Sequence, residues 1–348
     1  MTETVKKKKN TALLFLLAFA VLVVVTLVAN YRSPVVLKLR GPDTGVERLS
    51  IIENRLIVIS RENETYVWDW NNLSGWPQVG RVDAQKMTAF CGDRLLWVPA
   101  GSSNVLVVSD LKGDKELKRL PLGDIRKCDL LETSANGKYA AAALELYGNS
   151  GRGIQLAVID PNLTEVSAVV TENMEGKSKI ESISVSNDGA YIAGVGAKEA
   201  GWIFVAETRS KRILWEQTVK STVELNKVIF SPDGQFVYAS EPGRYIYVFE
   251  TATGKTVKQF VMDKYEAPAN NPQTIMVIAA SPDGRLFTAT TEPVATAWVW
   301  DVKTGQKITS YRAEKIISGL SFSPDSSLLV MGILVRSSIY IWKIPQGP

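Results

Sequence analysis

The chain of 348 residues contains no histidine, so it lacks the side chain that most often serves as general base, metal ligand and pH switch near neutrality. It has only two cysteines, Cys91 and Cys128, which lie far apart and form neither a CxxC metal pattern nor a disulfide framework. No GxSxG, P-loop or GxGxxG motif occurs in a suitable context. We therefore predict no catalytic residues, no cofactor-binding residues and no metal ligands, and the chain is expected not to be an enzyme.

A large excess of charge of one sign is also missing. The net charge is +4, and Lys6–Lys9 together with Glu3 account for +3 of it. The remainder of the chain is thus nearly neutral, which gives no electrostatic basis for binding nucleic acid.

The N-terminal region holds one long apolar run, from Thr11 to Ala29, with no charged residue in it. As a helix this run would be about 28 Å long, close to the thickness of the hydrocarbon layer, whereas the core of a cleavable signal peptide is shorter. We predict a transmembrane anchor over residues 11–30 that stays uncleaved. The lysines before it predict that residues 1–10 form a basic cytoplasmic tail and that the large domain is periplasmic or otherwise extracytoplasmic.

After the apolar run the sequence repeats itself. Ser231–Gly234, Ser281–Gly284 and Ser323–Ser326 each stand between two runs rich in β-branched and aromatic residues. Asp-Gly between such runs is a strong hairpin signal, because the turn requires positive φ. Weaker copies give turns centred near positions 54, 93, 136, 188, 233, 283 and 325. Their spacing of roughly 40–50 residues is that of propeller blades, so the sequence predicts an all-β fold of seven blades.

These repeats resemble those of the WD40 family and its bacterial YVTN-type relatives. Trp68-Asp69 and Trp300-Asp301 stand where that family has its Trp-Asp dipeptide, and Ser-Pro-Asp-Gly stands at the first hairpin of the blade. The resemblance implies a WD40-like β-propeller over residues 34–348. Because histidine is absent, the hydrogen-bond network of Asp, His, Ser and Trp found in many WD40 blades cannot form here.

The last blade is one strand short, because its third strand is expected near Ser338–Lys343 and the sequence stops at Pro348. Residues 34–40 alternate as an outer strand does, and we predict that they pair with the last blade and close the ring. The face with the hairpin turns would then look toward the membrane. Its membrane-facing residues would include Trp70, Trp76, Lys211, Lys255 and Lys303.

Longer connections are expected on the opposite face, at residues 145–153, 171–179 and 263–273. Variable loops on a rigid scaffold are common sites of binding. Tyr147, Arg152, Tyr265 and Asn270 are the candidate partner-binding residues, and the alternative is that these segments are ordinary surface loops.

Three carboxylates, Asp129, Glu181 and Glu224, are expected near the starts of inner strands and are candidates for a site in the central channel. Such residues are more often solvated or ion-paired. The leading hypothesis is a membrane-anchored interaction, assembly or stabilising subunit, with other protein subunits of a respiratory, photosynthetic or envelope complex as partners. The alternatives are a lactonase-like or quinoprotein-like propeller enzyme, or a small-ligand sensor that uses the channel.

Overall fold

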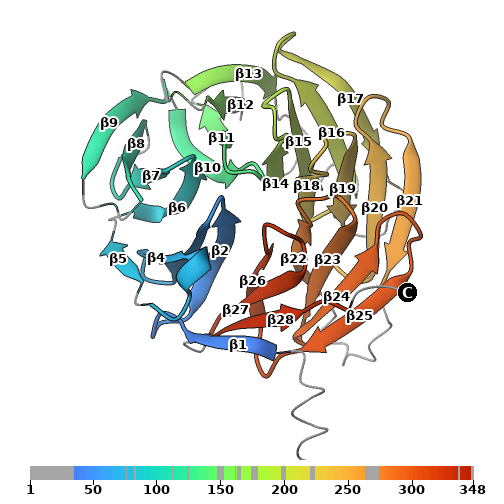
Figure 1. The fold of residues 1–348 in the computed structure, drawn as a ribbon. Helices are drawn as coiled ribbons and strands as arrows, with labels where there is room; N and C mark the ends of the chain where they lie inside the picture. Colours follow the sequence, from blue (N-terminus) through green and yellow to red (C-terminus); the bar gives the residue numbers. More distant parts are fainter. Residues whose placement is uncertain are drawn as a thin grey trace, which may run out of the picture.

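Seven four-stranded antiparallel sheets surround a central axis in the computed structural model of the chain (Figure 1). The structure describes residues 35–345, apart from 76, 82–83, 103, 112, 114, 124, 147–152, 161, 163–165, 174–178, 197–200, 220–223, 263–273 and 336–337. The predicted tail and anchor, residues 1–30, lie outside the described residues. Among the residues that are described, no helix has the length and apolar character needed to cross a membrane. The predicted all-β, seven-bladed architecture is confirmed.

Each blade runs from an inner strand at the axis to an outer strand at the rim. Blades one to three consist of β2 (Val46–Ile52), β3 (Arg55–Ser60), β4 (Glu64–Asp69) and β5 (Gln78–Arg81); β6 (Ala84–Cys91), β7 (Arg94–Pro99), β8 (Val105–Asp110) and β9 (Glu116–Pro121); and β10 (Ile125–Thr133), β11 (Ala140–Leu146), β12 (Gly153–Ile159) and β13 (Val166–Asn173). A short 3-10 helix, η1 (Trp70–Asn72), follows β4.

Blades four to six repeat this order. They consist of β14 (Ile180–Val185), β15 (Tyr191–Gly196), β16 (Trp202–Glu207) and β17 (Arg212–Thr218); β18 (Lys227–Phe230), β19 (Phe236–Ser240), β20 (Tyr245–Glu250) and β21 (Thr256–Val261); and β22 (Thr274–Ala280), β23 (Leu286–Glu292), β24 (Thr296–Asp301) and β25 (Lys307–Arg312).

The seventh blade joins the two ends of the described chain. It contains β26 (Ile317–Phe322), β27 (Leu328–Ile333) and β28 (Ser338–Lys343), and its outer strand is β1 (Val35–Arg40). β1 pairs antiparallel with β28, from Val35 opposite Trp342 to Arg40 opposite Ser338. This is the pairing that the alternation in residues 34–40 predicts, and it leaves β28 without an open edge.

The first hairpin of five blades is fixed by one recurrent set of hydrogen bonds. In blade five the Ser231 hydroxyl donates to Asp233 Oδ1 at 2.5 Å and accepts from the Phe236 N–H at 2.9 Å. The Gln235 N–H donates to the same carboxylate oxygen at 3.1 Å. Equivalent bonds join the pairs Ser134 and Asn136, Ser186 and Asp188, Ser281 and Asp283, and Ser323 and Asp325. The turn aspartates therefore have a structural role, and no histidine is needed for it.

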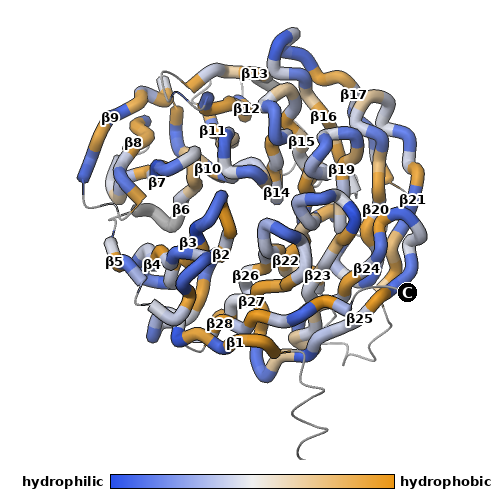
Figure 2. The backbone as a smooth tube through the Cα atoms, in the orientation of Figure 1, coloured by the Kyte–Doolittle hydropathy of each residue, from blue (hydrophilic) through white to orange (hydrophobic). Residues whose placement is uncertain are grey.

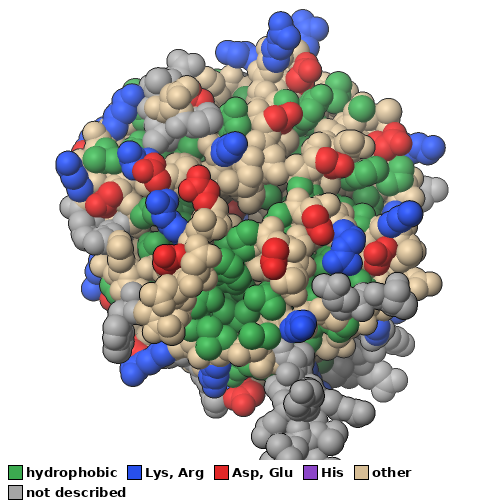
Figure 3. Space-filling model, in the orientation of Figure 1, with side chains coloured by type: hydrophobic (Ala, Val, Ile, Leu, Met, Phe, Trp, Pro, Cys, Tyr) green, Lys and Arg blue, Asp and Glu red, His purple; other side chains and the backbone are tan. Residues whose placement is uncertain are grey.

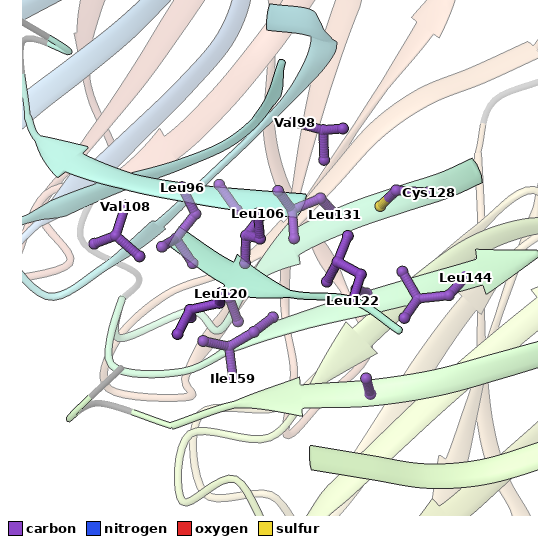
Figure 4. Packing of buried hydrophobic residues seen from close by; sticks show 14 of the residues in the cluster. Leu96, Val98, Leu106, Val108, Leu120, Leu122, Cys128, Leu131, Leu144 and Ile159 are labelled. Carbon is purple, nitrogen blue, oxygen red and sulfur yellow. The ribbon is translucent and has the colours of Figure 1, made fainter. Parts of the chain in front are cut away.

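The hydrophobic core lies between neighbouring blades, where one sheet packs on the next. Figure 2 shows hydrophobic residues along the strands and hydrophilic residues at many of the turns. Between blades two and three, side chains such as Leu96, Leu106, Leu120, Leu131 and Ile159 fill the space (Figure 4). Between blades five and six, Tyr238 and Phe287 stack with their rings 4.7 Å apart. Packing between blades thus accounts for most of the described aromatic residues, as expected for tryptophans in strands.

Ring closure depends on one close approach of backbones between blades one and seven. Gly45 has φ +89°, and a Cβ atom there would lie 1.9 Å from the carbonyl oxygen of Leu334. Gly92 also has positive φ, +59°, but a Cβ atom there would meet nothing within 4 Å. Substitutions at Gly45 and Gly92 can therefore separate the cost of a strained backbone conformation from the cost of a steric clash with Leu334.

We expect Gly92→Ala to lower the free energy of unfolding by about 1–2 kcal/mol, the cost of the left-handed conformation alone. Gly45→Ala should lower it by at least twice as much, because blade one must also move away from Leu334. Chemical denaturation followed by tryptophan fluorescence measures both. Equal losses in the two variants would show that the approach at Gly45 is not tight.

A second prediction concerns acid stability. Hydrogen bonds from Ser323 and Ser327 hold the pKa of Asp325 below its usual range. Since the folded pKa is the lower one, the stabilisation is present above the unfolded value of about 3.9 and is lost as the pH falls through the folded value. Asp325→Asn should lower the free energy of unfolding by about 0.5–1 kcal/mol at pH 7. The difference should vanish at a pH where Asp325 is protonated in both the folded and the unfolded parent.

Denaturation curves between pH 2 and pH 7 measure this difference. Asp93→Asn is the control, because Asp93 is an exposed turn carboxylate whose ion pair with Arg94 is largely open to solvent, and such pairs are worth little. A loss in Asp325→Asn that stays constant with pH would contradict the assigned role of its carboxylate.

Candidate functional site

A cavity of about 990 Å³ lies along the axis of the ring and is lined by the inner strands of all seven blades. Its wall is formed by Arg48, Thr88, Glu132, Ser182, Lys227, Val277 and Gly319, one from each inner strand in turn, with further residues between them. The channel therefore brings together side chains that are separated by about 40–50 residues in the sequence, the length of a propeller blade.

Hydroxyl side chains connect inner strands that belong to different sheets. The Ser182 and Ser184 hydroxyls on β14 each accept a hydrogen bond from β18, from the N–H groups of Val228 and Phe230, at 3.3 Å. The Thr133 hydroxyl on β10 accepts one from the Phe90 N–H on β6 at 2.7 Å. In each of these bonds the hydroxyl oxygen is the acceptor, so the bond does not use the hydrogen of the hydroxyl group.

Arg48 on β2 joins three blades from within the channel. Its guanidinium donates to the carbonyl oxygens of Thr88 at 3.0 Å and Leu131 at 3.1 Å. It also pairs with the Glu132 carboxylate at 3.2 Å. The charge of Arg48 is thus matched, and its planar group acts as a clamp between blades one, two and three.

Lys227 on β18 is a half-buried ammonium that lines the same cavity. Among the described residues no carboxylate forms an ion pair with its Nζ atom. Burial lowers the pKa of Lys227, while the charge of Glu132 partly opposes this effect. A cation taken out of water without a partner is costly, and packing alone does not explain it.

A second charged group lies where β10 starts and β11 ends. Lys127 Nζ is 2.6 Å from Asp129 Oδ1 and 3.6 Å from Glu145 Oε2, and Arg126 contacts Glu145 at 3.3 Å. The side chains of Asp129 and Glu145 are only 6% and 2% exposed, so both carboxylates depend on these cations. The hydrogen bond to Asp129, followed by the charges of Asp129 and then Glu145, raises the pKa of Lys127, and burial opposes this effect.

The three predicted channel carboxylates do not form one site. Asp129 belongs to the group around Lys127, Glu181 pairs with Lys179 at 3.4 Å, and Glu224 is exposed. In the described part of the chain, no three acidic or cysteine side chains are close enough to hold a metal ion. Cys91 and Cys128 are free and buried, and desolvation raises the pKa of each thiol to about 12.

The predicted membrane-facing residues that are described lie on one face. Trp70, Lys211, Lys255 and Lys303 all follow the third strand of a blade, and β28, the third strand of blade seven, ends beside Val35. Trp70 is half-buried and the three lysines are exposed, whereas Trp76 lies outside the described residues. Figure 3 shows hydrophobic side chains grouped over the sheets that contain β2 and β26. Half-buried residues at the interface between these sheets include Ile51 and Leu73.

These turns are held by the outer strand of the preceding blade. Gln217 on β17 donates to the carbonyl oxygen of Gly254 at 2.7 Å, and Lys258 on β21 donates to that of Lys303 at 2.8 Å. Tyr311 on β25 donates in the same way to Lys343 at the end of β28. Blades four, five and six therefore each support the third-strand turn or strand end of the blade that follows.

The candidate partner-binding residues Tyr147, Arg152, Tyr265 and Asn270 lie outside the described residues. The strands that flank them end on the face opposite to the third-strand turns. The strands also extend further than the sequence suggests. Residues 145–146 belong to β11 and 171–173 to β13, so these parts of the expected loops are strand.

Sequence reasoning missed Arg48, Glu132 and Lys227 as channel residues. One signal was available for Lys227, which stands four residues before the hairpin serine Ser231. The equivalent positions before Ser134, Ser186, Ser281 and Ser323 hold Leu130, Ser182, Val277 and Gly319. A lysine at that position of a buried inner strand breaks the pattern of the repeat.

No protein-family model matches the chain, and no curated protein matches it in sequence. Among solved structures, it is similar to the crystal structure of the β-propeller domain of Cps50 (Swd1) from Myceliophteria thermophila, with a TM-score of 0.67 and 14% identity. The match covers 89% of this chain and 100% of that one. At this identity the likeness shows the fold alone, and it agrees with the WD40-like propeller that the hairpin repeats predict.

The group around Lys127 gives a test of how its buried carboxylates are compensated. Lys127→Met removes a positive charge that compensates two buried carboxylates. We expect it to lower the free energy of unfolding by about 1–3 kcal/mol at pH 7. This is less than the value for a fully buried pair, because Lys127 is half exposed. Lys179→Met is the matched control at a more exposed pair and should cost less than about 1 kcal/mol.

Because the pKa of Lys127 is raised in the folded state, its stabilisation is complete below the unfolded value of about 10.4 and is lost as the pH rises through the folded value. The difference between Lys127→Met and the parent should therefore shrink in strong alkali. Equal losses at positions 127 and 179 in denaturation experiments would contradict this account.

Proposed function

We propose that this WD40-like propeller is a non-enzymatic interaction or assembly subunit of a membrane complex, held by a single N-terminal anchor at residues 11–30. In this proposal the basic tail is cytoplasmic and the ring lies on the extracytoplasmic side. The observation that carries the proposal is the place where β1 begins, because it determines how the ring is connected to the apolar run.

Only residues 30–34 separate the apolar run from β1. Even fully extended, five residues span about 17 Å. Val35 pairs with Trp342 at the end of β28, so the connection leaves the ring on the face of the third-strand turns. A ring on so short a connection is held close to the bilayer with that face toward it.

The side chains on this face suit a membrane surface. Trp70 is a half-buried aromatic residue in η1, and tryptophan is favoured at the boundary of lipid and water. Lys211, Lys255 and Lys303 are exposed, and each basic side chain near anionic head groups contributes on the order of 1 kcal/mol. The hydrogen bonds from the neighbouring outer strands hold the turns at positions 254 and 303 in place.

The opposite face then points away from the membrane and is available to a protein partner. The connections at 145–153, 171–179 and 263–273 are on this side, and Tyr147, Arg152, Tyr265 and Asn270 are the residues proposed to bind. Rigid scaffolds that present loops in this way commonly act through those loops. An interaction role on this fold needs no catalytic group, in agreement with the composition of the chain.

The test is purification of the full chain from its native membrane in mild detergent. We expect it to elute with other proteins in fixed ratio, as an assembly larger than the 38.2 kDa of the chain itself. A variant with Tyr147→Ala, Arg152→Glu, Tyr265→Ala and Asn270→Ala should remain in the membrane fraction and lose those proteins.

The matched control carries Lys211→Glu, Lys255→Glu and Lys303→Glu on the other face. It should keep the partner proteins and bind less tightly to anionic vesicles. Recovery of the parent as a lone chain, or the same partner content in both variants, would count against the proposal. A bound metal or organic cofactor in native mass spectrometry would favour a propeller enzyme.

A further inference from the structure

The central channel contains a positive charge that the fold leaves unmatched. Arg48 pairs with Glu132, Lys179 pairs with Glu181, and Lys127 pairs with Asp129. Lys227 faces the same cavity and has no ion pair with any carboxylate of the described residues. In four other blades the residue four positions before the hairpin serine is uncharged: Leu130, Ser182, Val277 and Gly319. The strand pairing of the blade therefore does not by itself require a lysine at this position.

Hydroxyl groups line the same cavity as Lys227. The hydroxyls of Ser182, Ser184 and Thr133 line the cavity, and each accepts a backbone hydrogen bond. Within the described residues none of these hydroxyls donates its hydrogen; Ser182 and Ser184 are on β14, the inner strand next to β18, and Thr133 is one blade further along the ring. Free donors and an unmatched cation select a ligand that accepts hydrogen bonds and carries negative charge.

The inner strand on the other flank of β18 is β22, and it lines the cavity with apolar side chains. Met276 and Val277 are half-buried there, and Ile278 is buried in the core between blades. A surface of this kind gains from contact with hydrocarbon rather than with a highly charged ion. The cavity lining also includes Glu47, Glu62 and Glu132, whose negative charges disfavour an anion of high charge.

We propose that the central channel binds a small organic carboxylate, with its carboxylate against the Lys227 ammonium and the hydroxyls of Ser182 and Ser184, and its apolar part against β22. The cavity of about 990 Å³ falls within the range of small-molecule sites. This role does not depend on the proposed assembly function, because the channel is formed within one ring.

The test uses the full chain in non-ionic detergent and three probes of matched size: butyrate, 1-butanol and butylammonium. Thermal unfolding is followed by tryptophan fluorescence. Butyrate should raise Tm in a saturable way, by about 2–4 °C at ten times its Kd. Butanol and butylammonium should give no saturable rise, since the first lacks the charge and the second has the wrong sign.

Lys227→Met removes the charge and keeps the length of the side chain. It should weaken butyrate binding at least tenfold, while Lys227→Arg retains binding and Lys179→Met stays within twofold of the parent. Without ligand, Lys227→Met should unfold at the parent temperature or above it, because the fold no longer buries an unmatched cation.

The pH dependence gives a second readout. Glu132 and Glu181 favour the protonated form of Lys227, whereas burial, Arg48 and Lys179 oppose it, and the net effect is a lowered pKa. Butyrate binding should therefore weaken as the pH rises through a value below the usual lysine range, and this step should be absent in Lys227→Met.

Three results would overturn the proposal. The first is butyrate affinity in Lys227→Met within twofold of the parent. The second is saturable binding of butanol or butylammonium as tight as that of butyrate. The third is a large fall in Tm of Lys227→Met without ligand, which would make Lys227 a residue of the fold rather than of a binding site.

Discussion

The inner strands of neighbouring blades belong to different sheets, so no backbone hydrogen-bond ladder joins them, and this constraint governs the rest of the ring. The connection is made by side chains. Ser182 and Ser184 bond to β18, Thr133 bonds to β6, and Ser321 accepts from the Ile51 N–H across the junction of blades seven and one. Apolar packing between sheets supplies most of the stabilisation, and these hydroxyls fix how each blade is placed against the next.

The same constraint explains why the channel is polar in one part and apolar in another. Where hydroxyls and Arg48 bridge the blades, the channel wall carries donors and charges. Around β22 the wall is apolar and consists of Met276, Val277 and Ile278. Lys227 on β18 lies between these regions, and it forms no ion pair with a carboxylate of the described residues.

Local signals in the sequence predict the fold because a propeller blade is mainly a set of tight hairpins. The Ser and Asp of the first hairpin lie two residues apart, and their hydrogen bonds are formed within the turn itself. Closure by residues 34–40 could be predicted from alternation and from the missing outer strand. The hydrogen bonds from Arg48 to Leu131 and Glu132 could not be predicted from the sequence. These residues are more than 80 positions from Arg48, and they meet it only when three blades are in place. The candidate loop residues remain predictions, since they fall outside the described residues.

The pairing of β1 with β28 also has a consequence for biosynthesis. β1 is made first and β28 last, and 297 residues separate Arg40 from Ser338. At about 5–20 residues per second, the ribosome needs roughly 15–60 s to supply the partner of β1. During that interval both edges of β1 are unsatisfied, in a segment that emerges directly after the most apolar part of the chain. A nascent chain of this architecture therefore carries an unpaired strand until β28 has been made, and such a strand is prone to aggregate.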